Sequence, residues 1–388
     1  MRRKRIKTCC LALTTALMMS AAGFSTAIAA GTGNDAAVQS AAEKAGAQDT
    51  DLEKEILEVQ EEEYEKTKAL QDIELSVNKS AEDFISDPYL LKAIIYAYNA
   101  GMNLTGAGQV TEDTFTSDML KAYAGDLDLS KAEGMDAVTD LTGLDYAVNA
   151  KSINISGCTK ITKISLKFPD AQFKSFVMPD TVTEIGDNAF QTCKMLESIE
   201  LPAGLTKIGE YAFANCESLK SVNVQGGTKD ALPDNLTIIG QQAFASCISL
   251  EKISIPSYSN GEILSPSVFA LCKGLKEINI GAGITAIPSS GFLNAGQSGD
   301  GAEGVTVTFA EGSLLKKFQT DAFKNAKFAG DSTLDLSMCE SLEEIMGSVF
   351  EGTSGLTKII LPDPTAGKTV TLGKDAFALS ELAAMGIK

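Results

Sequence analysis

The sequence predicts an α/β solenoid, a right-handed stack of coils with short parallel strands on one face and a small helical cap before it. A phenylalanine returns every 23 to 31 residues, and a Leu-x-x-Ile-x-Leu pattern precedes it in the clearest copies. A period in the twenties is typical of chains in which each repeat buries its apolar face against the next. The register phenylalanines are Phe190, Phe213, Phe244, Phe269, Phe292, Phe323, Phe350 and Phe377.

Residues 1–29 have the features of a secretory signal peptide. Five basic residues come first, an apolar stretch runs from Cys9 to Phe24, and Ala27-Ile28-Ala29 fits a small-x-small cleavage site. The apolar stretch is short for a bilayer span, so an uncleaved anchor is only the alternative. No later segment is apolar enough to cross a membrane, and no LPxTG-type motif lies near Lys388. We therefore expect a secreted, extracellular protein that can associate with the cell surface without a covalent wall anchor.

The composition excludes several classes of function. The chain of 388 residues has 33 basic and 51 acidic residues, no histidine and no tryptophan, and its arginines all lie within the first five positions. Without the signal peptide 28 basic and 51 acidic residues remain, a net charge of −23. Such a polyanion repels nucleic acid and anionic lipid surfaces. A Ser-His-Asp triad and an imidazole zinc site are impossible without histidine. We expect no enzyme, no cofactor and no metal.

Two short regions precede the repeats. Residues 30–80 read as an acidic linker and a helix from Asp51 to Val77, with nine carboxylates between residues 49 and 65. Glu63 and Lys66 interrupt its apolar seam, which favours a solvated helix over a coiled coil. Residues 81–150 read as a helical N-terminal cap, with one helix starting at Pro88, another over Thr114 to Tyr123, and a short strand around residues 126–129.

Residues 151–388 form the predicted solenoid, whose clearest repeat runs from Leu196 to Cys216. Alternate side chains of its strand face one way, so stacking completes the core and pairs the strands in parallel at a spacing of about 4.8 Å. The Ile-Gly step is expected to allow a tight bend. The Ala-Phe step is expected to begin a compact helical or 3₁₀ turn, with the phenylalanine filling the core.

The cysteines of the mature chain follow the same register. Four of the six close a Phe-x-x-Cys step, and alanine, threonine or serine takes that place in other copies. Exchange with small residues indicates a buried packing side chain and favours free thiols. Disulfides between neighbouring coils are the alternative, and zinc is disfavoured because no CxxC pair exists. The six are Cys158, Cys193, Cys216, Cys247, Cys272 and Cys339, and the replacing residues are Ala295, Ala326, Thr353 and Ser380.

The motif Leu-Pro-x-x-Leu-Thr-x-Ile-Gly-x-x-Ala-Phe-x-x-Cys at residues 201–216 resembles the BspA-type (Treponema pallidum-type) leucine-rich repeat, and the resemblance covers about 180 to 380. Residues 87–90, 141–146 and 153–158 are similar to the cap and first repeats of internalin-like proteins. The resemblance implies a leucine-rich-repeat stack and a secreted or surface-exposed bacterial protein, linked to adhesion and to binding of host or bacterial proteins. It does not imply an enzyme. The chain departs from the family in lacking an evident surface anchor.

A row of small polar residues on the solvent side of the strands is the predicted docking surface. It has no aromatic anchor of the kind that interface hot spots prefer, so a plain solvated sheet is an equal alternative. The row is Asn154, Glu200, Asn223, Ser254, Asn279, Thr308 and Asp335, with Val177 and Ile360 in the same register.

Loops at the rims of this face are the second candidate. Insertions at 226–234 and 296–304 flank the strands, and Tyr258 lies in a similar loop; tolerated drift is the alternative. Asp126-x-Asp128-x-Ser130 lacks the glycine and glutamate of a calcium loop and is rejected. We expect a protein partner on a host or bacterial surface. The alternative function is a passive structural or spacer module of the cell envelope.

Overall fold

The computed structural model describes residues 52–69, 77–257, 263–298, 303–363, 369–378 and 380, all within the unit Leu52–Lys388. The predicted signal peptide, the linker before residue 52 and Tyr258 lie outside the described residues. No helix in these ranges is both long and apolar enough to span a membrane.

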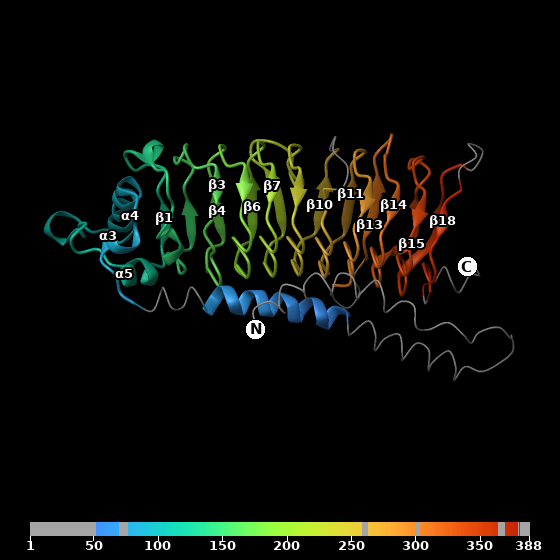
Figure 1. Cartoon of the computed structure of the whole chain (residues 1–388). Helices are drawn as coiled ribbons and strands as arrows, with labels where there is room; N and C mark the ends of the chain where they lie inside the picture. Colours follow the sequence, from blue (N-terminus) through green and yellow to red (C-terminus); the bar gives the residue numbers. More distant parts are fainter. Residues whose placement is uncertain are drawn as a thin grey trace, which may run out of the picture. The chain divides into compact units, whose positions relative to one another are not determined.

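The predicted parallel-strand solenoid is confirmed (Figure 1). Each regular coil contributes one strand to a first row, whose outward side we call the strand face, and a two-residue strand to a second row, the second face. The first row is β1 (Asp126–Asp128), β2 (Ser152–Asn154), β4 (Ser175–Val177), β6 (Ser198–Leu201), β8 (Ser221–Val224), β10 (Lys252–Ile255), β11 (Glu277–Ile280), β13 (Thr306–Phe309), β15 (Lys327–Asp335) and β17 (Ser354–Ile360). The second is β3 (Lys163–Ile164), β5 (Glu184–Ile185), β7 (Lys207–Ile208), β9 (Ile238–Ile239), β12 (Ala286–Ile287), β14 (Lys317–Phe318), β16 (Glu344–Ile345) and β18 (Thr371–Leu372).

The register phenylalanines form one column through the core. Their rings lie nearly parallel, with centroids 5.1 to 5.9 Å apart and interplanar angles of 1 to 13° from Phe168 to Phe377. Phe168 extends the column one coil before the predicted register. The spacing is close to the predicted distance between stacked strands, because one ring per coil follows the rise of the backbone.

The turn that carries each phenylalanine is neither the compact helix nor the 3₁₀ turn expected from the sequence. The residue two before the phenylalanine and the residue two after it both adopt positive φ, as at Asn188 (61°) and Thr192 (59°). A left-handed residue stops a right-handed helix, so a series of i to i−3 turns results. The backbone N–H groups of residues 188, 190 and 192 instead donate to the carbonyls of residues 210, 212 and 214 in the next coil. We call these turns the turn row.

The glycine of the Ile-Gly step is required by close packing between coils, not by a bend of unusual φ. A Cβ at Gly209 would lie 2.5 Å from the backbone nitrogen of Asp187 and 2.6 Å from the carbonyl carbon of Gly186. Gly209 is not among the residues with positive φ. The close approach of the preceding coil thus accounts for the glycine, and the predicted role in a tight bend stays a prediction.

The region before the repeats contains short helices packed on the first coil. Its α3 (Ala81–Phe84), α4 (Pro88–Gly101), α5 (Ser117–Ala122) and the 3₁₀ turns η1 (Gly106–Gly108), η2 (Met135–Ala137) and η3 (Leu144–Tyr146) precede β2. The predicted start at Pro88 is confirmed, and the Asp87 side chain caps α4 by accepting from the N–H groups of Tyr89 and Leu90. The predicted second helix is shorter than expected, and the predicted strand is β1.

A helix over residues 52–69 precedes this cap region. The sequence predicts a solvated helix, but in the structure one face is buried, at Ile56, Gln60, Tyr64 and Thr67. These residues follow each other at steps of four, four and three, which places them on one side of an α-helix. The helix runs along one edge of the coils (Figure 1, blue) and packs on the turn row.

Candidate binding surface

The structure aligns the predicted strand-face residues with one another. Asn154 pairs with Val177, Glu200 with Asn223, and Asp335 with Ile360, while Ser254, Asn279 and Thr308 continue across three strands. Their burial alternates with that of core residues, as in the buried-exposed pattern of β6. The row therefore exists as a geometric feature, with one side chain per coil on the outward side of the strands.

Part of this row is engaged in hydrogen bonds along the stack. The Asn279 side-chain nitrogen donates to Ser254 Oγ (3.2 Å), and Thr308 Oγ1 donates to Asn279 Oδ1 (2.5 Å). Lys252 forms an ion pair with Glu277 (2.9 Å) beside them, and the donated bond from that lysine, followed by one from Asn279, lowers the pKa of the Glu277 carboxyl. Glu200 and Thr308 are exposed, whereas Asn154, Asn223, Ser254 and Asn279 are half-buried.

The insertion at 226–234 interrupts the first row. Ala231 bridges to Ser254, and the backbone of residues 230–232 exchanges hydrogen bonds with Ser254 where β8 would meet β10 directly. Asn223 accepts from the N–H of Asp230 (3.0 Å), so this predicted site residue holds the insertion. The first row divides into β1-β2-β4, β6-β8, β10-β11-β13 and β15-β17. Of the second insertion, residues 299–302 lie outside the described part of the chain.

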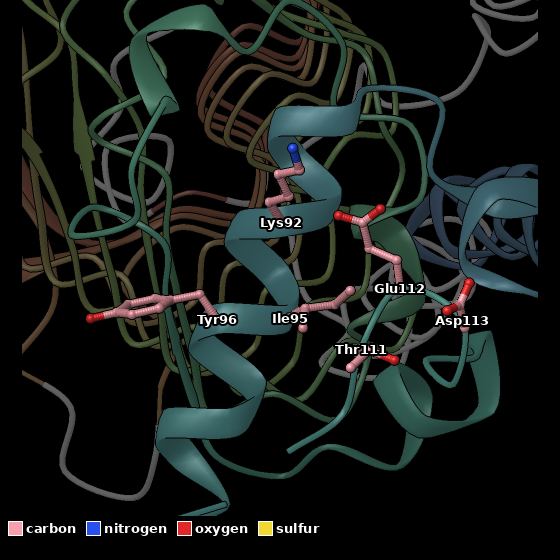
Figure 2. Close-up of a pocket in the computed structure, with 6 residues that line it drawn as sticks. All are labelled: Lys92, Ile95, Tyr96, Thr111, Glu112 and Asp113. Carbon is pink, nitrogen blue, oxygen red and sulfur yellow. The ribbon is translucent and has the colours of Figure 1, made fainter. Parts of the chain in front are cut away.

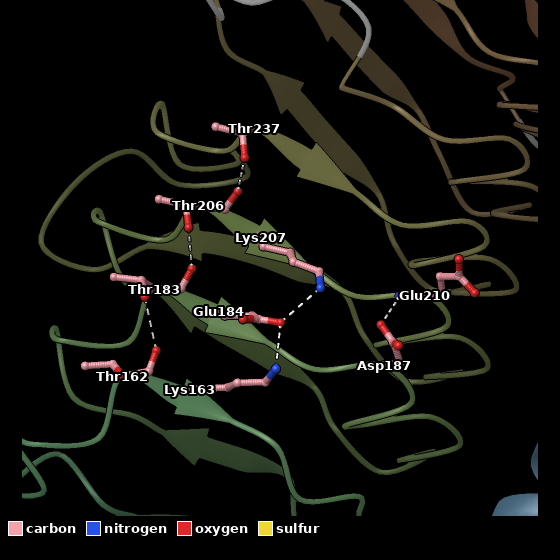
Figure 3. Close-up of polar contacts among 9 residues, drawn as sticks. All are labelled: Thr162, Lys163, Thr183, Glu184, Asp187, Thr206, Lys207, Glu210 and Thr237. Carbon is pink, nitrogen blue, oxygen red and sulfur yellow. Dashed lines mark hydrogen bonds and ion pairs between the residues drawn. The ribbon is translucent and has the colours of Figure 1, made fainter.

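The second face uses its polar groups for contacts between coils (Figure 3). Thr206 Oγ1 donates to the carbonyl of Thr183 (2.9 Å), and the same contact recurs in the neighbouring coils. Glu184 lies between Lys163 (2.8 Å) and Lys207 (3.0 Å), and these two bonds lower the pKa of its carboxyl. Exposed pairs of this kind contribute little stability each, but they leave the second face with fewer unengaged groups.

The repeat cysteines are buried packing residues, as the sequence predicts. Cys193, Cys216, Cys247 and Cys272 are fully buried, and each thiol donates to the carbonyl of the phenylalanine one coil earlier, at 3.1 or 3.2 Å. The residues that replace them are buried too. Burial raises the pKa of Cys158 to about 12 and that of Cys216 further. Such thiols are poor nucleophiles at neutral pH.

The remaining chemistry of the described residues is sparse. They contain no cluster of three or more metal-ligating side chains. A shallow hollow of about 460 Å³ lies beside α4 in the cap region (Figure 2). Its polar lining residues are exposed and carry both signs of charge, so we assign it no ligand. The hollow is lined by Lys92, Ile95, Tyr96, Thr111, Glu112 and Asp113.

The turn row beneath the helix is a surface that sequence reasoning missed. Gln191, Ser246, Lys273 and Asn294 contact this helix, although no motif marks them. Three of them, Gln191, Ser246 and Asn294, lie one or two residues after a register phenylalanine. This shared position in the repeat is the sequence signal that could have identified the surface.

Comparison with known proteins finds leucine-rich-repeat structures of low sequence identity. No protein with a curated description matches the chain. A solved leucine-rich-repeat protein of T. pallidum is 22% identical, covers 46% of this chain and 76% of its own, and superposes with a TM-score of 0.30. A leucine-rich repeat protein from Bacteroides ovatus is 23% identical over 60% of this chain and 68% of its own (TM-score 0.35). A leucine-rich cell surface protein from Faecalibacterium prausnitzii is 21% identical over 57% and 66% (TM-score 0.30).

The sequence profile described as the BspA type leucine-rich repeat region matches residues 159–298 and 316–388 in six copies. These ranges take in more than half of the chain and contain the column of phenylalanines and the turn row. The assignment rests on this repeat and not on the superpositions. The chain belongs to the BspA-type leucine-rich-repeat family.

Proposed function

We propose that the chain is a secreted bacterial protein that binds a protein partner at or beyond the cell surface through its strand face. The observation that carries the proposal is the outward row of side chains, which the core does not use and which repeats once per coil. The BspA-type family, whose members include surface proteins, supports a binding module over an enzyme. The net charge of −23 without the signal peptide opposes binding to the phosphate backbone of nucleic acids.

Two exposed side chains on either side of the break between β8 and β10 make the sharpest test. Thr308 and Glu200 are exposed and lie on β13 and β6. The variants Glu200→Lys and Thr308→Lys each place a long cationic side chain on the strand face and leave the core unchanged. Thr371, an exposed threonine on β18 of the second face, provides the matched control as Thr371→Lys. All three variants are used to recover partners from host and bacterial surface extracts.

We expect that Glu200→Lys and Thr308→Lys no longer bind a saturable partner and that Thr371→Lys still binds it. Retention with the strand-face variants shows that the strand face is not the site. The passive spacer is the competing function, and it predicts no saturable partner for the unmodified chain. The loop containing Tyr258 remains a second candidate contact, tested by Tyr258→Ala in the same assay.

A further inference from the structure

The helix over residues 52–69 matches the turn row in pitch. One α-helical turn rises 5.4 Å, and successive coils are stacked at 5.1 to 5.8 Å between Phe168 and Phe292. The rise of one helical turn is therefore close to the spacing of the coils, but one helix residue can reach more than one coil: Gln60 contacts both Ser246 and Gln191. Glu53 contacts Asn294, Ile56 lies in a cluster with Ala270, and Tyr64 contacts Asp170, so the helix and the coils run in opposite directions.

The interface combines an apolar cluster with polar contacts. Its apolar part contains Ile56 and Leu52 of the helix against alanines and leucines of three coils, Ala245, Ala270, Leu271 and Leu293. At its centre lies Gln60, which is 1% exposed and accepts from Ser246 Oγ (3.1 Å). Gln60 Nε2 and Asn294 Oδ1 are buried without a hydrogen-bond partner among the described residues. Unpaired buried groups weaken an interface, and contacts of this polarity are typical of surfaces that also exist apart.

Charge complements this arrangement at both ends of the helix, whereas in between the pKa of the Glu210 carboxyl is raised by burial, by Asp187 and by Glu63 of the helix. Lys273 on the turn row forms an ion pair with Glu53 (2.6 Å), and at the other end Lys68 pairs with Asp170 (3.0 Å). The pKa of Lys194 is raised mainly by its hydrogen bond to Glu217, and the negative charge of Glu61 on the helix adds to this rise. The helix that the turn row holds is thus acidic at its first contact, basic at its last, and carries Ile56 and Tyr64 as anchors about two turns apart.

We propose that the turn row is a docking surface for an acidic amphipathic helix of a partner protein, and that the helix over 52–69 occupies it as an intramolecular competitor. The inference is independent of the strand face. A partner helix binds when the resident helix leaves, so the apparent dissociation constant equals the intrinsic one divided by the fraction of molecules whose turn row is free.

The test compares two substitutions of one kind on opposite sides of the helix. Ile56→Asp places a carboxylate in the apolar cluster, where Ile56 is 6% exposed, and is expected to release the helix. Leu57→Asp changes a side chain that is 43% exposed and is the control. The probe is a fluorescent peptide with the sequence of residues 52–69, which stands for a partner helix, and binding is followed by anisotropy on the purified chain.

We expect the peptide to bind Ile56→Asp at least about tenfold more tightly than it binds the unmodified chain or Leu57→Asp. No binding to Ile56→Asp refutes the docking surface, and equal binding to all three refutes the competitor. Protection of the buried thiols shows that Ile56→Asp keeps the solenoid folded. Zero-length crosslinking of Glu53 to Lys273 checks release directly, because the product must be lost in Ile56→Asp and kept in Leu57→Asp. A crosslink between two copies of the unmodified chain makes the occupant a second copy and overturns the proposal.

Discussion

The column of phenylalanines predicts a stability cost that depends on position in the stack. Phe244 is fully buried, and its ring lies between Phe213 (5.1 Å, 8°) and Phe269 (5.3 Å, 10°). Truncating a buried phenylalanine to alanine costs about 3–5 kcal/mol, and a ring pair adds about 0.5–1.5 kcal/mol beyond burial. With two ring neighbours, Phe244→Ala is expected near the upper end, at about 4–5 kcal/mol.

Phe377 provides the matched comparison. It has one ring neighbour in the column, Phe350 at 5.6 Å, and is 7% exposed. We expect Phe377→Ala to cost about 2–3 kcal/mol, since one ring contact and part of the buried area are missing from the start. The more conservative Phe244→Leu keeps most of the volume and loses both ring contacts, for about 1–3 kcal/mol.

Urea unfolding followed by far-UV circular dichroism measures these costs, provided that the slope with denaturant is unchanged among the variants. Equal losses for Phe244→Ala and Phe377→Ala would refute the reasoning, because each coil would then be stabilised without its neighbours. A loss below about 2 kcal/mol at Phe244 would show that surrounding side chains collapse into the space.

Three further predictions follow from the packing. Gly209→Ala is expected to cost about 1–3 kcal/mol through its clash with the preceding coil, whereas Gly204→Ala, with open space around it, stays within about 0.5 kcal/mol in the same urea assay. Burial alone raises the pKa of Asp87, but the N–H groups of Thr139, Leu90, Tyr89 and Asp140 outweigh it and lower that pKa, so its contribution is full above pH about 4 and is lost as pH falls through the folded value. Asp87→Ala should therefore cost about 1–2 kcal/mol at pH 7 and flatten the acid limb of the stability profile. A thiol reagent at pH 8 should react with six cysteines of residues 30–388 only after unfolding; fewer than six without reductant indicates a disulfide.

The repeat made the core predictable. Phe190 to Phe377 were assigned from spacing alone, and each lies in the column, because a ring that fills one coil must sit above the ring that fills the last. The repeat likewise predicts that Cys193, and the small residues at the same position of other coils, are buried. The strand-face register followed from the alternation of side chains along each strand.

Two features could not be read from the pattern. The positive φ at Asn188 and Thr192 recurs with serine, aspartate, leucine and tyrosine in other coils, so no single residue type announces it. The contact of the helix over 52–69 depends on Gln60 and Tyr64 meeting coils more than a hundred residues away. Glu63 and Lys66 interrupt an apolar seam, but the turn row contacts the helix through polar groups such as Gln60, so an uninterrupted seam is not required.

The division of the first row has a consequence for what can bind there. Between β8 and β10 the segment 230–232 takes the place of direct pairing, so the residue-per-coil repeat of the strand face stops and restarts. An extended partner that matches one coil after another can stay in phase over β10, β11 and β13, but not across this break. The strand face therefore consists of several short segments in series. Under the proposed function, a partner that spans two of them is expected to bind through linked contacts and not through one continuous contact.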